Sequence, residues 1–387
     1  MNDFTFVSPT KIYFGEKYIS DIGRILKEKD VKKVLIVYGN NPKKIGLIDK
    51  IIELLNLENI KTYELSEIRV NPKKEKVYEG ISLVKKYKID FILAIGGGSV
   101  IDTSKAIAAG SLVDFDFFNF NLHKDIVKKA LPIGVILTIA ASGSELSDSC
   151  VISDDLNNIK NGFNSDLVRP TLAFLNPNFL KTLPKIEMAR GLTDIFMHTF
   201  ERYIYKSINN EIADGFAISL LTNLINSTKK YLKDNNDYEA LSNIMLLGSF
   251  SHNGLTSIGK PFIMIVHKLE HNVGGFYPLL VHADGLSILV RSFLNNYKLF
   301  IKDKLIKLGK EAFNLANLDE FNLMNFTVQE IINFLDSLKM PKKFSDLDIS
   351  FDPVKMSDNL LKGSEVYKYS LHDLNKEDLI KIYKESL

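Results

Sequence analysis

The chain has 387 residues, of which 45% are hydrophobic and 25% charged, and this balance excludes a disordered protein. A formal net charge of +2 argues against a protein that coats nucleic acid or anionic membranes, and a single cysteine excludes a disulfide framework. No uncharged apolar run reaches the ~18 residues of a membrane span, and the N-terminal segment is not expected to be a secretory signal. We therefore expect a cytoplasmic enzyme of two domains that binds neither nucleic acid nor membrane.

The first part of the chain alternates short apolar runs with helical patterns. Strands are predicted at 34–38, 62–65, 91–95, 134–139 and 171–175, and helices at 48–55 and 73–88. The turn formers at 39–42 are expected to follow the first of these strands as a turn. A continuous apolar run such as 91–95 is typical of a strand buried on both faces, so we expect a parallel sheet with helices on both sides.

After Pro177 the strand signals fade and helical spacing of apolar residues takes over. Helices are predicted at 186–204, 210–233, 238–255, 261–275, 283–298, 302–316 and 327–338. We place a domain boundary near Pro184. The sequence therefore predicts an α/β domain over 1–184 and an all-helical domain over 185–387.

A glycine-rich turn follows the 91–95 strand and opens a helix. Gly96, Gly97 and Gly98 let the backbone pass close to a bulky ligand and tolerate positive φ. The helix N-terminus presents unpaired N–H groups to an anion, which suits the pyrophosphate of a dinucleotide. Ile101 replaces the third glycine of the complete dinucleotide fingerprint, so a plain strand-to-helix turn is the alternative.

Two further features near this turn can contact a nucleotide. Asp102 can hydrogen-bond the cofactor, or it can simply strengthen the helix N-terminus through the helix dipole. A hydroxyl-rich turn follows the 134–139 strand, and its Thr138 and Ser142 can touch a cofactor. Ser142 and Glu145 also have the spacing of a capping box, which is the structural alternative.

Histidines are concentrated in the second half of the chain, with four of the seven between residues 252 and 282. Asp194 and His198 are four residues apart, as are His267 and His271, so each pair lies on one face of a helix. The apolar neighbours of the first pair make a bare carboxylate costly unless a cation compensates it. A buried ion pair between Asp194 and His198 is the alternative if they are taken alone.

His282 follows a glycine-containing turn and can bring a third imidazole. One carboxylate with three neutral imidazoles suits Fe²⁺ or Zn²⁺, and Mn, Co or Ni can also bind such a set. The predicted metal ligands are Asp194, His198, His267 and His282. Three more residues are candidate neighbours, as surface groups or as supports of the ligands: Glu201, Glu270 and His252.

Taken together, these motifs resemble the iron-containing (group III) alcohol dehydrogenases, within them the branch of butanol dehydrogenases and broad-range aldehyde reductases. The resemblance covers essentially the whole chain. Besides the two spaced pairs, it is carried by residues 8–15, 96–102, 142–145, 168–170, 176–177 and 182–184. It implies an N-terminal Rossmann-like dinucleotide-binding domain and a C-terminal helical metal-binding and catalytic domain. This agrees with the two domains expected above.

The resemblance also implies roles for individual residues. The metal ligands of the family fall on Asp194, His198, His267 and His282, and its proton-relay histidine falls on His271. The catalytic residues would therefore be His271 and Asp194. The cofactor contacts fall on Gly97, Gly98, Ser99, Asp102, Thr138 and Ser142, with Gly39 and Asn40 in the turn after the first strand. A divalent metal, Fe²⁺ before Zn²⁺, NADP or NAD, and a homodimer or larger homo-oligomer are implied.

This chain departs from the family pattern at three points. His282 follows His267 by fifteen residues, one more than is usual, which makes His282 the least secure ligand. Ala283 follows that histidine where many members have glycine, as in the aldehyde-reductase branch. The segment 39–42 reads Gly-Asn-Asn-Pro where NADP-preferring members of that branch have Gly-Gly-Gly-Ser.

The expected reaction is reversible hydride transfer between a nicotinamide and short-to-medium-chain aldehydes or primary alcohols. A metal would act as a Lewis acid on the substrate oxygen. Residues 38–48 hold no acid, and the nearby Lys43 and Lys44 favour NADP; Glu64 and Glu67 reverse this preference if they reach the ribose.

Three alternatives stay open at this point. The same scaffold could carry a glycerol dehydrogenase or a dehydroquinate-synthase-like enzyme. A metal-dependent hydrolase would use the metal to activate water, but it leaves the turn at 96–99 without a purpose. A non-catalytic binding protein could retain the scaffold alone.

Overall fold

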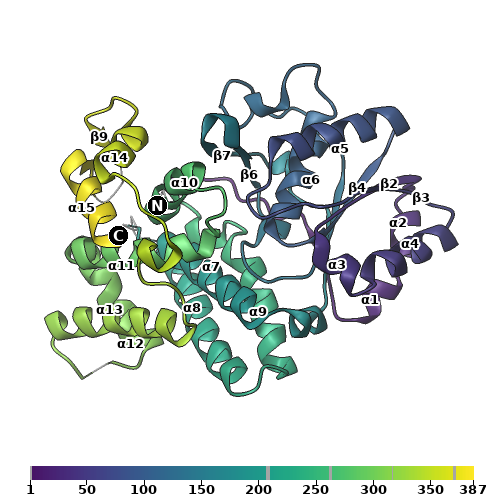
Figure 1. Ribbon diagram of the computed structural model, residues 1–387. Coiled ribbons are helices and arrows are strands. Elements are labelled where there is room, and N and C mark those ends of the chain that lie inside the picture. Colours follow the sequence, from purple (N-terminus) through teal and green to yellow (C-terminus); the bar gives the residue numbers. More distant parts are fainter. Residues whose placement is uncertain (1, 206–209, 261–263, 316, 369–371) are drawn as a thin grey trace. The chain divides into compact units, whose positions relative to one another are not determined.

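The computed structural model describes residues 2–205, 210–260, 264–315, 317–368 and 372–387 (Figure 1). The chain divides into two compact units, here called the sheet unit and the helical unit. The sheet unit comprises Val7–Leu183 and Asn236–Ser249. The helical unit comprises Met1–Phe6, Pro184–Asn235 and Phe250–Leu387. The main part of the helical unit begins at Pro184, where the domain boundary was predicted. The segment 236–249 was expected in the helical domain but belongs to the sheet unit.

The sheet unit is built on six parallel strands, which confirms the predicted parallel sheet. In sheet order the strands are β1 (Lys11–Phe14), β8 (Leu172–Leu175), β5 (Ile133–Leu137), β4 (Phe91–Gly96), β2 (Lys33–Tyr38) and β3 (Lys61–Leu65). Every residue of β4, β5 and β8 is buried, as the continuous apolar runs predict for strands covered on both faces. The edge strand β1 was not among the expected strands.

Helices cover both faces of this sheet. The helices around the sheet are α1 (Lys17–Ser20), α2 (Ile22–Lys27), α3 (Asn40–Lys44), α4 (Leu47–Leu57), α5 (Lys74–Tyr87) and α6 (Gly98–Gly110). Most of α9 (Tyr238–Ser251) also belongs to the sheet unit. The helical spacing of α4 puts Ile51 and Leu55 on one face, where they join the same core cluster as Ile36 and Leu93 of the sheet. α5 and α6 lie side by side on the other face (Figure 1).

Two local features of the sheet unit differ from the expectation. The segment expected as a turn at 39–42 begins α3, because Pro42 lies in the first helical turn, where its missing N–H is not needed. An antiparallel hairpin of β6 (Ser149–Asp154) and β7 (Ile159–Asn164), which was not expected, follows the loop after β5.

The helical unit is formed by eight described α-helices. They are α7 (Lys185–Tyr203), α8 (Glu211–Lys233), α10 (Ile265–Phe276), α11 (His282–Tyr297), α12 (Lys302–Ala312), α13 (Glu320–Ser337), α14 (Pro353–Leu361) and α15 (Lys376–Ser386). The helix expected at 261–275 begins partly outside the described residues, and α14 and α15 were not expected. The unit is not all-helical as predicted, because it also contains two short paired strands, β9 (Val366–Tyr367) and β10 (Leu374–Asn375).

Helix α7 lies at the centre of the helical unit and packs against α8 and α11. Fifteen of its residues are buried, including Phe196 and Phe200, whose rings stack. The face of α7 that carries Asp194 and His198 is therefore held within a packed core. Within the parts of the chain that the structure describes, none of the helices combines the length and the apolar character that a membrane crossing needs.

Candidate metal centre and nucleotide-binding turns

Three predicted metal ligands converge from three helices of the helical unit. Asp194 lies on α7, His267 on α10 and His282 at the start of α11, and their ligand atoms lie within 4.8 Å of one another. Asp194 Oδ1 is 3.9 Å from Nε2 of His267 and 3.9 Å from Nε2 of His282. His282 lies in the group although it follows His267 by fifteen residues.

The polar atoms of this group fit a metal ion. Asp194 Oδ1 and His267 Nε2 are buried without a hydrogen-bond partner, which is costly unless something else compensates them. When two atoms bind the same zinc or iron ion at about 2.0–2.2 Å, they lie ~3–4 Å apart. The 3.9 Å distances from Asp194 Oδ1 to the two Nε2 atoms match this spacing. The His282 side chain is 26% exposed, against 8% for Asp194 and 6% for His267, so solvent reaches the group at His282.

Two buried carboxylates hold the rings of these histidines. Glu201 of α7 accepts a hydrogen bond from Nδ1 of His267, and Glu270 of α10 accepts one from Nδ1 of His282. With the proton on Nδ1, each ring keeps the lone pair of Nε2 for a metal. Glu201 and Glu270 were expected to be either surface groups or residues that hold the predicted ligands in place. Their hydrogen bonds to His267 and His282 favour the second interpretation. Glu201 follows His198 by three residues, and this helical spacing was the available signal.

His198 lies beside the group of three rather than within it. Its Nδ1 is 3.2 Å from Asp194 Oδ1 and 3.0 Å from the backbone carbonyl oxygen of Asp194. A proton on Nδ1 donated to that carbonyl leaves Nε2 as the metal-binding atom of His198. The His198 ring centroid is 4.5 Å from that of His267 and 4.3 Å from that of His252, so both histidines are its neighbours. The ligand role of His198 stays a prediction.

His271 lies one helical turn after His267 on α10. Its ring centroid is 5.2 Å from that of His282, and its ligand atom lies with those of Glu270 and His282 in a second group within 4.8 Å. The residue is partly exposed. The structure thus brings the predicted proton-relay histidine next to a predicted ligand and within reach of solvent.

Burial and neighbouring charges set the protonation of this site. Burial lowers the pKa of His198 to about 4, so the imidazole is neutral at pH 7, the form that binds a metal. Burial alone would raise the pKa of Asp194, but His198, His267 and His282 outweigh it and hold that pKa well below the usual value. Asp194 is therefore a carboxylate across the physiological range.

The glycine turn before α6 is required for close approach rather than for positive φ. Gly97 is extended, with φ −106° and ψ −162°, and none of Gly96, Gly97 and Gly98 has positive φ, so the tolerance of glycine for positive φ is not used in this turn. A Cβ on Gly97 would lie 2.2 Å from Cγ2 of Ile139, and one on Gly98 would lie 2.5 Å from Oγ of Ser142. The turn therefore packs directly against the loop that follows β5.

Three predicted cofactor segments meet at one edge of the sheet. Gly39, Gly97 and Thr138 follow β2, β4 and β5, which are neighbours in the sheet, and the Thr138 N–H donates to the Gly96 carbonyl at 3.1 Å. Helices α3 and α6 both begin here without a side-chain cap, at Gly39 and Gly97. Their first N–H groups, including those of Asn40 in α3 and Ser99 in α6, can face an anion.

α4 and α6 then cover opposite faces of the sheet (Figure 1). Ligands of open α/β sheets bind at such a point, outside the carboxyl ends of the strands.

Asp102 is engaged within the sheet unit. Its Oδ1 accepts from the Ser144 hydroxyl at 2.6 Å, and its Oδ2 accepts from the Val151 N–H at 2.9 Å. The fully buried Lys105 donates to Ser144 Oγ at 2.9 Å and to the carbonyls of Ser147 and Ser149 at 2.9 and 2.8 Å. This network ties α6 to the loop before β6, and the cofactor contact of Asp102 stays a prediction.

The alternative capping box of Ser142 and Glu145 is wrong. The short helix there is Ser144–Leu146, the residue before it is Gly143 in a left-handed conformation, and no side chain caps it. Glu145 is buried and instead accepts a hydrogen bond from the Ser249 hydroxyl of α9 at 2.6 Å. Burial raises the pKa of Glu145. This contact attaches α9 to the sheet unit.

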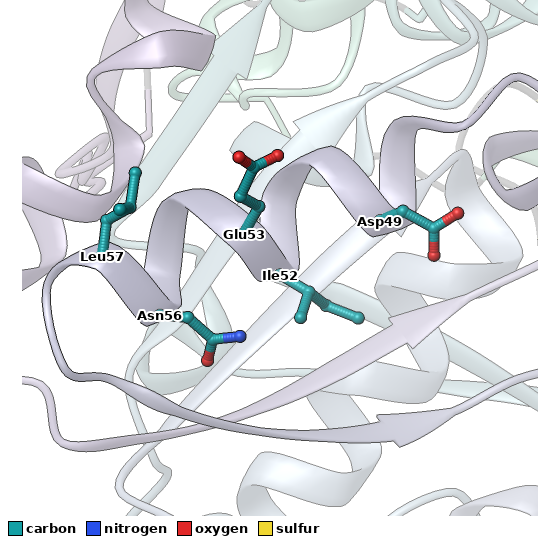
Figure 2. Close-up of a pocket in the computed structure, with 5 residues that line it drawn as sticks. All are labelled: Asp49, Ile52, Glu53, Asn56 and Leu57. Carbon is teal, nitrogen blue, oxygen red and sulfur yellow. The ribbon is translucent and has the colours of Figure 1, made fainter.

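A surface depression lies on α4. Figure 2 shows its lining, which is Asp49, Ile52, Glu53, Asn56 and Leu57. The Leu57 side chain is 71% exposed, so the depression is open to solvent. None of the predicted site residues lines it.

Comparisons with known proteins agree with this geometry. The family model described as iron-containing alcohol dehydrogenase matches residues 9–177, and that described as Fe-containing alcohol dehydrogenase family, C-terminal, matches residues 188–387. The chain is 34% identical to NADH-dependent butanol dehydrogenase A of Clostridium acetobutylicum over 100% of both proteins. It is 31% identical to the NADPH-dependent aldehyde reductase YqhD of Escherichia coli over 89% of both.

A solved structure is also similar. The crystal structure of NADH-dependent butanol dehydrogenase A from Thermotoga maritima matches with a TM-score of 0.92 and 29% identity. The match covers 100% of this chain and 99% of that chain.

Proposed function

The chain belongs to the iron-containing alcohol dehydrogenase family, and on this premise we propose that it is a metal-dependent, NAD(P)H-linked alcohol dehydrogenase and aldehyde reductase. Its substrates would be short-to-medium-chain aldehydes and the matching primary alcohols. The observation that carries the proposal is the buried Asp194 Oδ1, which lacks a hydrogen-bond partner and lies 3.9 Å from Nε2 of both His267 and His282. Fe²⁺ is proposed before Zn²⁺, because imidazole and carboxylate ligands suit both and the family is iron-containing.

The reaction consumes an aldehyde, NAD(P)H and a proton and yields an alcohol and NAD(P)⁺. A divalent cation bound by Asp194, His267 and His282, with His198 beside them, supplies Lewis-acid polarisation of the substrate oxygen. Glu201 and Glu270 keep the histidine Nε2 atoms available for that cation. The uncapped first turns of α3 and α6 would hold the phosphates of a nicotinamide cofactor, which would supply the hydride.

A steady-state assay with metal analysis tests this proposal. Purified protein is assayed with NADPH and NADH against straight-chain aldehydes of two to six carbons, before and after metal removal. We expect turnover that depends on one bound divalent metal per chain. Full turnover by metal-free protein, or glycerol outperforming all simple alcohols in the oxidising direction, would contradict the proposal.

His271→Ala is expected to slow the reaction and leave the metal bound. His271 is partly exposed and lies next to the metal group, so it can pass a proton between the alcohol oxygen and solvent. Loss of such a proton transfer should lower kcat ~10²-fold or more. The measurements are kcat with butanal and bound metal by mass spectrometry. His372→Ala removes an exposed histidine elsewhere in the helical unit and should leave both unchanged. Loss of metal in His271→Ala would make it a ligand instead.

NADPH is the proposed preferred cofactor. Lys43 and Lys44 are exposed at the end of α3, and residues 38–48 still contribute no acid. Glu64 accepts a hydrogen bond from the Tyr38 hydroxyl at 2.5 Å, which engages one of the two acids that could oppose a 2′-phosphate. Replacing both lysines by alanine should lower the ratio of kcat/KM for NADPH to that for NADH by ~10-fold. A wild-type protein that prefers NADH would contradict this choice.

Other parts of the sequence interpretation stay proposals. We propose that residues 1–184 supply nucleotide binding and residues 185–387 metal binding and catalysis. We also propose a homodimer or larger homo-oligomer in the cytoplasm. Light scattering coupled to size-exclusion chromatography tests the assembly, and a monomer at micromolar concentration would contradict it.

A further inference from the structure

Glu201 makes more contacts than a support for one ring needs. Its Oε1 accepts from the backbone N–H of Val266 at 2.7 Å, and its Oε2 accepts from the backbone N–H of His267 at 3.1 Å. Oε2 also accepts from Nδ1 of His267. The Glu201 side chain is 1% exposed, so these three bonds form away from water.

The backbone contacts replace a missing helix cap. Helix α10 begins after Met264, whose side chain offers no strong acceptor and makes no cap. Val266 and His267 are the second and third residues of the helix, and their N–H groups are those that an N-cap side chain normally satisfies. A carboxylate from α7 supplies that cap, and its charge also suits the positive end of the helix dipole.

The same carboxylate therefore fixes two things at once: where the backbone of α10 begins and how the His267 ring is turned. Glu201 lies on α7 seven residues after Asp194, which is two helical turns and the same helix face. We propose that Glu201 is a positioning residue that sets the spacing of Asp194 and His267 for the metal, by capping α10 from α7 while holding the His267 ring. This inference rests on the metal centre proposed above.

The test uses Glu201→Gln and Co²⁺ as a spectroscopic metal. Glutamine keeps the shape but puts an NH₂ group in place of one acceptor oxygen, so at least one of the three bonds is lost. We expect the Kd for Co²⁺, measured by chelator competition, to rise ~10- to 100-fold. The visible absorption bands of the bound Co²⁺ should shift as its ligand geometry loosens. If Glu201→Gln does not fold, Glu201→Asp carries the same test, because it withdraws the carboxylate by one methylene.

Asp319→Ala is the matched control for the loss of a helix cap. Asp319 caps α13 in the same unit by accepting from the Asn322 N–H at 3.0 Å. Its loss should lower the melting temperature and leave the Co²⁺ Kd and spectrum unchanged. If Glu201→Gln also lowers only the melting temperature, Glu201 is merely a cap and the inference is overturned. If the wild-type protein binds no Co²⁺, the metal centre itself fails, which is a distinguishable result.

Discussion

Asp194→Ala is expected to lose bound metal and aldehyde reduction together, with kcat/KM falling ~10³-fold or more. Asp194 Oδ1 is the one atom that lies 3.9 Å from Nε2 of both His267 and His282, so its removal takes away the shared anionic ligand. It also removes the carboxylate that would balance the charge of a cation directly, and leaves only Glu201 and Glu270 behind the imidazole rings. The rate is measured with butanal and saturating NAD(P)H, and the metal by elemental analysis.

Thermal unfolding separates metal loss from misfolding. A metal at 100 times its Kd stabilises the wild-type protein by about 2.7 kcal/mol, and this gain should vanish in Asp194→Ala. Asp214→Asn is a control for the loss of a buried carboxylate, because Asp214 pairs with Lys260 and Lys304 in the same unit. It should lower stability yet keep the metal-dependent rise in melting temperature. A metal-free Asp194→Ala protein with full activity would refute the assignment.

Gly97→Ala is expected to weaken NAD(P)H binding by ~10- to 100-fold. The new Cβ would lie 2.2 Å from Cγ2 of Ile139, so the Ile139 side chain must turn away or the loop after β5 must move. Overpacking of this kind costs ~1–3 kcal/mol, and that loop carries Thr138 and Ser142. The Kd for NAD(P)H is measured by fluorescence titration.

A second substitution gives this prediction its control. Adding Ile139→Ala to Gly97→Ala removes the clashing methyl group and should restore most of the binding. Gly215→Ala has open space around its Cβ on the exposed face of α8, so it should stabilise the protein by ~0.5–1 kcal/mol with cofactor binding unchanged. If Gly97→Ala binds NAD(P)H like the wild type, the turn is not a nucleotide site.

The parts of this structure that could be predicted from sequence are those with a local cause. The period of apolar residues located α4 and α7, and an unbroken apolar run located β4. Spacing by four put Asp194 and His198 on one helix face, because helix geometry alone fixes that relation. The edge strand β1 has only partly buried residues, so its pattern was weak.

What could not be predicted depends on contacts between distant segments. Glu201 meets α10 only after the chain has folded, and no local pattern states which N–H groups it will cap. The atom of His198 that faces Asp194 is set by a side-chain rotamer and a proton position. Gly97 is required because Ile139 packs against it, whereas sequence reasoning could only invoke backbone freedom.

The place of helix α9 in the sequence affects the co-translational folding of the protein and the design of truncated chains. The sheet unit includes Asn236–Ser249, which the ribosome synthesises more than fifty residues after Leu183. A chain stopped at 183 would contain all six strands of the main sheet but would lack Ser249, the hydroxyl that donates to the buried Glu145. We therefore expect a chain cut after Leu183 to be less stable than the sheet unit of the full protein, and that unit would be complete only after residues 236–249 have been synthesised.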